Sequence, residues 1–209
     1  MKKELQAKIN KIINDTKAKF LGFDILYKGE FINLIKEYYK LPDDRIITRE
    51  RIVKNNNKQA VIIVARTQDN KYILVVQNRI NKMTTIEFPS GYVEEGENII
   101  EASARELLEE TGYTSNDFIQ IDSYYTQIGI DSSIVNIVVA NNCIKTNKQN
   151  LGKNEYINYY EFTFQELEEL FNNNIINSVG NKLAFYKLSS INLNDKKYVK
   201  KINIRWWKN

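Results

Sequence analysis

One segment constrains this chain more than any other: residues 91–113 read GYVEEGENIIEASARELLEETGY. From Asn98 to Thr111 the segment is rich in the helix formers Ala, Glu and Leu and holds neither proline nor glycine, which predicts a helix. Gly112 follows as a stop signal for that helix. One helix face is expected to pack on a core, because four residues recur at spacings of three and four: Ala104, Leu107, Leu108 and Thr111.

Three glutamates of the same helix stand at i, i+3 and i+4, so their carboxylates should project from a common face: Glu106, Glu109 and Glu110. Like charges so placed repel one another and do nothing to stabilise the helix. A hard divalent cation would relieve the repulsion, since Mg²⁺ prefers oxygen ligands and usually keeps waters and substrate phosphates in its shell. Mn²⁺ accepts the same ligands. An ordinary solvated acidic helix face would show the same spacing, so the spacing alone leaves both interpretations open.

Composition narrows the chemistry that the chain can perform. The chain has 209 residues, 43% of them hydrophobic, which fits one compact domain with an added subdomain. The net charge of +4 is spread widely and does not indicate a nucleic-acid binder. The sequence contains no histidine, which excludes a Ser-His-Asp triad and a His-ligated zinc site. Catalysis would therefore rest on carboxylates, Lys, Arg, Tyr and a metal.

Two features bear on the cellular setting. Cys143 is the single cysteine, so an internal disulfide is excluded and a buried strand residue is expected. The start, MKKELQAKINKI, is basic but lacks an apolar stretch of signal-peptide type, and no apolar run is long enough to span a membrane. We therefore expect a cytoplasmic protein with neither a membrane nor nucleic acid as its partner.

Both ends of the chain carry apolar residues that need an interpretation. Residues 2–20 read as an amphipathic helix, whose apolar stripe we expect to form a core or dimer contact, because the strongly basic polar face of a membrane anchor is missing. Near the C-terminus, Trp206 and Trp207 stand among six Lys and Arg residues. Such a tail could be a stacking surface for nucleic acid; we expect instead that its aromatics pack and its lysines are solvated.

Apolar runs separated by turn residues predict strands and helices along the rest of the chain. Strands are expected at 20–41 and 45–53, then at 60–66, 72–79, 85–91, 118–125, 134–143 and 155–162, with helices at 163–171 and 179–190 and an edge strand in the C-terminal tail. This order predicts the α/β class, as a mixed sheet with helices on both faces, an α/β/α sandwich. We expect an N-terminal helix and strand extension over 1–57 and a main domain over 58–209.

Eight residues of the opening segment fit the pattern Gly-x5-Glu-x7-Arg-Glu-apolar-x-Glu-Glu-x-Gly: Gly91, Glu97, Arg105, Glu106, Leu107, Glu109, Glu110 and Gly112. The pattern resembles the Nudix box, the signature of hydrolases that cut a diphosphate linked to another moiety. The resemblance implies an α/β/α sandwich and Mg²⁺-dependent hydrolysis, with Mn²⁺ as the other candidate metal.

Matches outside the box resemble one subgroup, the ADP-ribose pyrophosphatases. They include Gln77–Arg79 at a strand end, Glu87–Gly91 before the box and Gly152–Ile157 in a later loop, besides an N-terminal portion around Arg49 and Glu50. The resemblance implies a nucleotide-sugar substrate, with ADP-ribose cleaved to AMP and ribose 5-phosphate. It also implies a homodimer in which N-terminal strands, about residues 25–53, cross to the partner and help complete its site. Where the subgroup often has Ser-Pro-Gly, this chain has residues 126–129 without proline.

The resemblance assigns roles within and beside the box. Glu106, Glu109 and Glu110 are the expected metal ligands, joined by the Ser90 backbone carbonyl. Arg105 is expected to orient the glutamates, and Glu97 to fix the preceding loop through backbone N–H groups. We group Arg105 and Glu109 with Glu155 as the catalytic set, while the box residues Gly91, Glu97 and Gly112 have structural roles.

Three further roles have ordinary alternatives. Arg79 is expected to bind phosphate oxygens, which a planar guanidinium does bidentately, but it could be a surface ion-pair partner. Glu155 is expected to be the base or to position the water, but an exposed loop carboxylate needs no role. Arg49 and Glu50 are expected to contact substrate and could equally be strand-edge charges.

Two other functions remain compatible with the box. A Nudix hydrolase could cut another diphosphate, such as a dinucleotide, a nucleoside triphosphate or a capped RNA end. A Nudix fold could also sense ADP-ribose without cutting it, although such a module would not need a cluster of repelling carboxylates.

Overall fold

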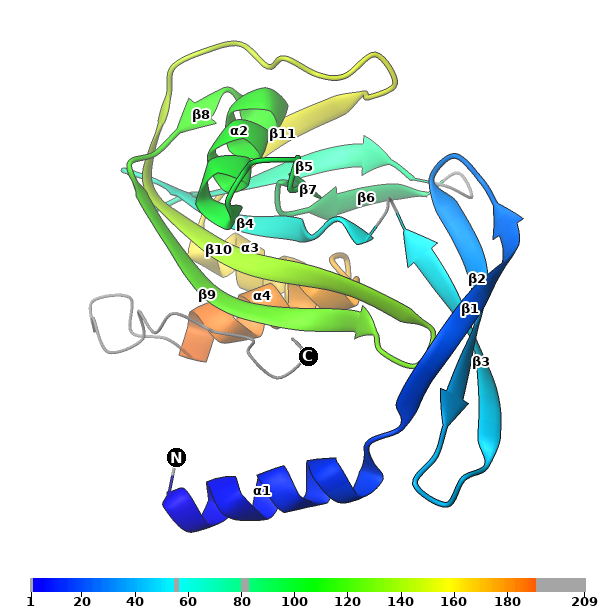
Figure 1. The fold of residues 1–209 in the computed structure, drawn as a ribbon. Coiled ribbons are helices and arrows are strands. Elements are labelled where there is room, and N and C mark those ends of the chain that lie inside the picture. The colour runs from blue at the N-terminus through cyan, green and yellow to red at the C-terminus, as the bar shows by residue number, and fades with distance from the viewer. Residues whose placement is uncertain (1, 55–56, 80–82, 191–209) are drawn as a thin grey trace. The chain divides into compact units, whose positions relative to one another are not determined.

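The computed structural model describes residues 2–54, 57–79 and 83–190, and the edge strand expected in the C-terminal tail lies outside this part of the chain. The chain separates into two compact units. Unit 1 comprises Met1–Asn57 together with Gln127–Ser133, and unit 2 comprises Lys58–Thr126 together with Ile134–Asn209. The helices and strands of each unit are labelled in Figure 1.

Unit 1 is a small antiparallel sheet preceded by a helix. Its elements are α1 (Lys3–Thr16), β1 (Lys19–Lys28), β2 (Ile32–Lys40) and β3 (Ile46–Lys54), and β2 pairs with both other strands. The predicted turn before β3 is present, because Asp44 takes the left-handed conformation with φ 67°. Asp131, at the start of the long strand β10 (Asp131–Lys145), pairs with β3.

Helix α1 has its apolar stripe in solvent. No residue of this helix is buried, and Leu5 and Ile12 are about half exposed, at 49% and 53%. The expectation of a core contact within the chain was therefore wrong, which leaves the dimer contact as a prediction. The helix is also shorter than expected, because the chain enters β1 at Lys19.

Unit 2 is built on a mixed sheet. Strand β10 runs parallel to β4, β4 is antiparallel to β5, and β5 is antiparallel to β11. The elements of this unit, besides β10, are β4 (Ala60–Thr67), β5 (Tyr72–Asn78), β6 (Thr84–Glu87), β7 (Ser90–Tyr92), α2 (Ile99–Thr111), β8 (Tyr113–Thr114), β9 (Asp117–Gln127), β11 (Ile157–Phe162), α3 (Phe164–Asn172) and α4 (Val179–Ser190).

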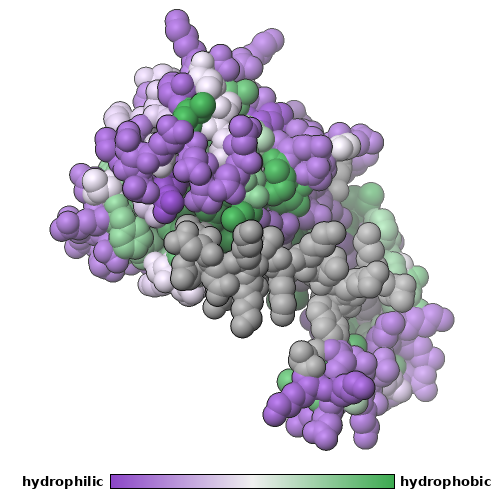
Figure 2. All heavy atoms as spheres, turned by 90° about the vertical axis from the view of Figure 1, so that its left-hand side faces the viewer, coloured by the Kyte–Doolittle hydropathy of each residue, from purple (hydrophilic) through white to green (hydrophobic). Residues whose placement is uncertain are grey.

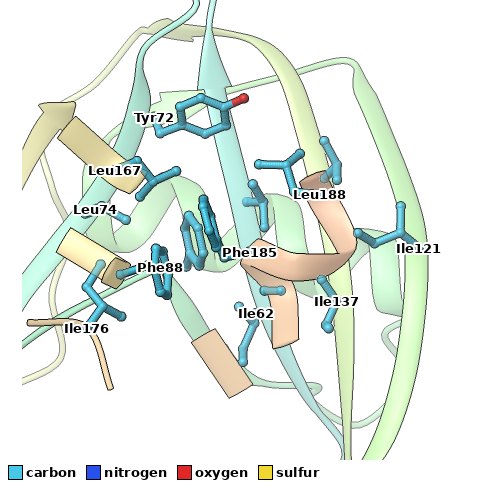
Figure 3. Packing of buried hydrophobic residues seen from close by; sticks show 14 of the residues in the cluster. Ile62, Tyr72, Leu74, Phe88, Ile121, Ile137, Leu167, Ile176, Phe185 and Leu188 are labelled. Carbon is cyan, nitrogen blue, oxygen red and sulfur yellow. The ribbon is translucent and has the colours of Figure 1, made fainter. Parts of the chain in front are cut away.

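Helices cover both faces of this sheet, and the alternation along β4 shows why. Ile62 of β4 belongs to a core cluster with Leu167 of α3 and Phe185 of α4 (Figure 3). Val64 and Phe171 belong to the same cluster, and the rings of Phe171 and Phe185 stack with centroids 4.3 Å apart. The intervening residues of β4 belong to a second cluster with Leu107 of α2. A strand buried on both faces must be apolar throughout, as AVIIVA is. The predicted α/β/α arrangement is confirmed.

The surface is more hydrophilic than this core. Hydrophilic residues dominate the face shown in Figure 2, with hydrophobic ones visible between them. Among the described residues, no helix is long and apolar enough to cross a membrane. Cys143 is buried on β10 with 1% exposure, as predicted.

Candidate active site

Helix α2 spans Ile99–Thr111, close to the predicted 98–111, and both of its ends are capped. The side chain of Asn98 accepts hydrogen bonds from the N–H groups of Ile100 and Glu101, at 2.9 and 3.0 Å, and Glu101 accepts one from the Asn98 N–H at 2.8 Å. This reciprocal capping box satisfies N–H groups that a helix start leaves free. Gly112 then adopts φ 69°, the left-handed conformation in which glycine ends helices.

The buried face of α2 differs from the predicted one. Ala104 and Leu108 are only partly buried, whereas the fully buried residues are Ala102, Ser103, Leu107, Glu110 and Thr111. The predicted apolar face was therefore wrong in part. The helix is turned so that one of the three glutamates, Glu110, points inward.

Arg105 binds the loop before the helix to the helix itself. Its guanidinium donates two hydrogen bonds to Glu97, at 2.7 and 3.0 Å, and one to the Tyr92 carbonyl at 2.8 Å. It also donates to Glu106 at 2.8 Å and to Glu109 at 3.0 Å. These carboxylates raise the pKa of Arg105, and the bond to Arg105 lowers the pKa of Glu97. A fixed guanidinium fork of this kind sets the spacing of two carboxylates.

Glu97 also holds the loop directly, since it accepts a hydrogen bond from the Glu94 N–H at 3.0 Å. Gly91 is required for a different reason. A Cβ atom at this position would lie 2.0 Å from the Glu106 carboxyl group, so a side chain there would displace that group. The missing side chain leaves a cradle that the Glu106 carboxylate fills.

Glu110 occupies the driest position of the three glutamates. It is 5% exposed and accepts a hydrogen bond from the Ser90 N–H at 2.9 Å. Burial raises its pKa to about 8, and burial also raises the pKa of Glu106. The negative charge of Glu155 also raises the pKa values of Glu106 and Glu110. The three carboxylates therefore lie close enough to interact electrostatically.

A cavity of about 450 Å³ brings part of the predicted set together. Glu106 and Glu109 line it from α2, Ser90 from β7, and Glu155 from the loop before β11. The remaining lining residues are Gly91, Tyr92, Glu94, Arg105, Asn150, Leu151 and Gly152. Glu155 accepts a hydrogen bond from the Gly152 N–H at 2.8 Å, which curls the loop around its carboxylate.

Within the described residues, no three acidic side chains are already gathered around a single point as a closed metal cage. Glu106 and Glu109 face the cavity and share Arg105, while Glu110 is turned to the Ser90 N–H. The donor set nevertheless fits a hard divalent cation, because it consists of carboxylate oxygens at the wall of an open cavity. The cradle at Gly91 keeps one of these carboxylates at the wall.

The other predicted residues lie differently. Arg79 is an exposed residue that forms an ion pair with Glu87, and its positive charge partly offsets the rise in the pKa of Glu110. Arg49 and Glu50 belong to β3 in unit 1, where both are exposed. Glu87 was not predicted as the partner of Arg79, although it stands at the start of the matched pattern Glu87–Gly91.

Comparisons with known proteins identify the family of this chain. A family model described as NUDIX domain matches residues 56–179. ADP-ribose pyrophosphatase of Bacillus subtilis (strain 168) is 32% identical over 154 residues, which are 73% of this chain and 82% of the relative. Methanol dehydrogenase activator of Bacillus methanolicus is 31% identical over 150 residues, 71% of this chain and 80% of the relative.

A shorter match and a solved structure extend the comparison. ADP compounds hydrolase NudE of Escherichia coli (strain K12) is 31% identical over 88 residues, 42% of this chain and 47% of the relative. The crystal structure of an ADP compounds hydrolase has a TM-score of 0.74 and 22% identity, and the match covers 83% of this chain and 93% of that one. At that identity the likeness concerns the fold. The family model spans more than half of the chain and contains the whole helix of glutamates, so this chain belongs to the NUDIX domain family.

Proposed function

We propose that this chain hydrolyses ADP-ribose, or a closely related nucleoside diphosphate sugar, to AMP and the sugar phosphate, with Mg²⁺ as its metal and Mn²⁺ as the alternative. The observation that carries the proposal is the cavity in which Glu106 and Glu109 of the box face Glu155 of a separate loop. The similarity to a relative named ADP-ribose pyrophosphatase, 32% identical, supports the choice of substrate.

The carboxylates of Glu106, Glu109 and Glu110 would hold the metal, together with the Ser90 carbonyl. A divalent cation bound there supplies a Lewis acid for diphosphate oxygens and lowers the pKa of a water molecule. Arg105 keeps Glu106 and Glu109 at a fixed spacing, and Gly91 keeps room for the first of them. The carboxylates of this set repel one another when no cation is bound, and a bound cation would relieve that repulsion.

Hydrolysis forms one P–O bond and breaks another. The water oxygen bonds to one phosphorus of the diphosphate, the bridging P–O bond breaks, and the second phosphate leaves with its sugar. Glu155 lines the same cavity and is the group we assign to accept the proton of the water or to hold the water in line. Arg79 would bind diphosphate oxygens by exchanging its present partner Glu87 for them.

Two further assignments concern the molecule as a whole. We assign residues 1–57 to dimerisation and 58–209 to the hydrolase domain, with Arg49 and Glu50 contacting the substrate of the partner. Exposed apolar residues on β1 support the first assignment, since Phe23 and Ile25 are 54% and 56% exposed. We also assign the protein to the cytoplasm, in keeping with its unpaired buried Cys143.

A substrate panel tests the proposal. Purified protein would be incubated with Mg²⁺ and, in separate reactions, with ADP-ribose, a dinucleoside polyphosphate, a nucleoside triphosphate or capped RNA, and the products separated by chromatography. We expect the highest kcat/KM for ADP-ribose, with AMP released. Glu106→Gln should abolish this release, while Glu168→Gln should not, because Glu168 is an exposed glutamate on α3.

Two other outcomes of the substrate panel would indicate a different function. Preference for another diphosphate by tenfold or more would overturn the substrate and keep the reaction. Tight binding of ADP-ribose by calorimetry, with no turnover in Mg²⁺ or Mn²⁺, would indicate a sensing module.

A further inference from the structure

The C-terminal end of α2 is closed in an unusual way. A helix leaves its last four carbonyl groups without partners inside the regular helix. Here each of the four accepts a hydrogen bond, and three of the donors come from residues 145–150. The bonds are Gly112 N–H to Leu108 at 2.7 Å, Asn150 N–H to Glu109 at 2.9 Å, the Gln149 side chain to Glu110 at 2.5 Å and Lys145 Nζ to Thr111 at 2.5 Å.

Gln149 makes a second bond that ties this helix end to the sheet. Its side-chain nitrogen also donates to the carbonyl of Ile157 at 3.0 Å. Ile157 is buried, with 4% exposure, and pairs with Gln77 of β5. One amide group therefore joins the helix that carries the box glutamates to the first residue of β11.

Glu155 lies on the short stretch of chain between these fixed points. The Asn150 N–H is bound to the Glu109 carbonyl, and Ile157 is bound into the sheet. Between them the Glu155 N–H donates to the Gly152 carbonyl at 3.0 Å, so the stretch forms a tight turn. The Gln149 side chain binds both α2 and the first residue of β11, and it does not line the cavity.

We propose that Gln149 is a positioning residue for the hydrolysis: its side-chain amide clamps the loop to helix α2 and thereby sets where Glu155 stands relative to Glu106 and Glu109. This inference rests on the proposed function for the role of Glu155, but the clamp itself does not. A primary amide suits the position, because it offers two N–H groups to two carbonyl oxygens and adds no charge. A carboxylate there could donate to neither and would face the negative end of the helix.

The kinetic test uses variants of the full chain. Gln149→Met keeps the length and removes both donors, and Lys148→Met alters the exposed neighbouring side chain as a control. We expect Gln149→Met to lower kcat by roughly tenfold, because misplacement of Glu155 slows the chemical step, with KM changed by less than about twofold. Lys148→Met should leave both constants unchanged.

A double-mutant cycle separates positioning from stability. If Gln149 acts through Glu155, Gln149→Met should have less than about a twofold effect on kcat in a Glu155→Gln background, because the group it positions is gone. The same factor in both backgrounds would overturn the proposal and leave Gln149 with a purely structural role. An unchanged kcat for Glu155→Gln alone would overturn it as well.

Hydrogen–deuterium exchange tests the clamp without substrate. In the metal-free protein we expect Gln149→Met to speed exchange at the Asn150 and Glu155 amides by roughly tenfold, as local opening becomes easier, while the core of β4 stays protected. Unchanged exchange at both amides would overturn the clamp. If the wild type cut no ADP-ribose but exchange rose as expected, the clamp would stand and the substrate assignment would fail.

Discussion

Glu110 places a carboxyl group where water hardly reaches, with 5% exposure and one hydrogen bond from the Ser90 N–H. Burial raises its pKa to about 8 from an ordinary value of 4.5. A raised carboxyl pKa costs stability as the pH rises, because the unfolded chain gives up the proton first. The cost is absent below about pH 4.5 and grows until about pH 8, where the folded form also ionises.

Glu110→Gln should therefore stabilise the metal-free protein while abolishing hydrolysis. At pH 7 we expect a gain in the free energy of unfolding on the order of 3 kcal/mol, from the difference between the two pKa values. At about pH 4.5 the gain should nearly vanish. Urea unfolding in the presence of a chelator at both pH values measures it. An equal stability change at both pH values would contradict the buried, proton-holding state of Glu110.

Metal binding should remove protons from the raised-pKa glutamates. Ligands must lose their protons before they bind a cation, and Glu106 and Glu110 both have raised pKa values in the metal-free protein. We expect calorimetry of Mg²⁺ binding at pH 7 to show proton release, as a heat that depends on the ionisation enthalpy of the buffer. The same heat in PIPES and in Tris would contradict proton release.

Gly91→Ala tests the cradle of Glu106. The added methyl group would meet the far end of a flexible side chain, so the fold should survive with a stability loss of about 1 kcal/mol. The displaced carboxylate should lower kcat by about 100-fold, the scale of a small misplacement at a reacting centre. Gly129→Ala is the control, because nothing lies within 4 Å of its added atom. Equal activity of the two variants would contradict the role of Gly91.

At the scale of elements, local sequence signals predicted the bounds of α2 closely. The environment of its glutamates depends on tertiary contacts, which those signals do not contain. The capping residues Asn98 and Gly112 stand at the two ends that the sequence indicates. The spacing of the glutamates predicted a shared face, but burial of Glu110 depends on β7, whose Ser90 N–H lies against it. Gln149 carried no recognisable signal, because its partners lie 39 and 8 residues away in sequence.

Two capping boxes of the same design allow a matched comparison. Asn98 caps α2, and Thr163 caps α3 with Glu166 as its reciprocal partner. Replacing either by Ala should lower the free energy of unfolding by about 1 kcal/mol. Asn98→Ala should cost more, because its side chain accepts two backbone N–H bonds and Thr163 accepts one. Urea midpoints of the two variants measure this, and a larger loss for Thr163→Ala would contradict it.

At the scale of the whole molecule, the order of apolar runs predicted the mixed sheet of unit 2 because a strand buried on both faces has a recognisable composition. Unit 1 was harder to interpret. Helix α1 carries an apolar stripe with no buried residue, and β1 exposes large apolar side chains over most of its length. Amphipathic patterning shows that burial of an apolar face would be favourable. It does not show which surface buries that face.

The proposed dimer makes a prediction at this scale. Light scattering at micromolar concentration should give twice the chain mass of 24.5 kDa. Phe23→Glu should yield the monomer, because it places a charge on the apolar surface of β1. Ile175→Glu, at an exposed residue of unit 2, should leave the dimer intact. A monomeric wild type would contradict the assignment of residues 1–57 to dimerisation.

The most direct test of the central claim is product analysis of ADP-ribose incubated with the wild-type protein and Mg²⁺, in parallel with Glu106→Gln. We expect equal amounts of AMP and ribose 5-phosphate from the wild type, no product when a chelator is added, and none from the variant. The claim would be contradicted if ADP-ribose stayed intact with the wild type in both Mg²⁺ and Mn²⁺, or if Glu106→Gln released AMP as fast as the wild type.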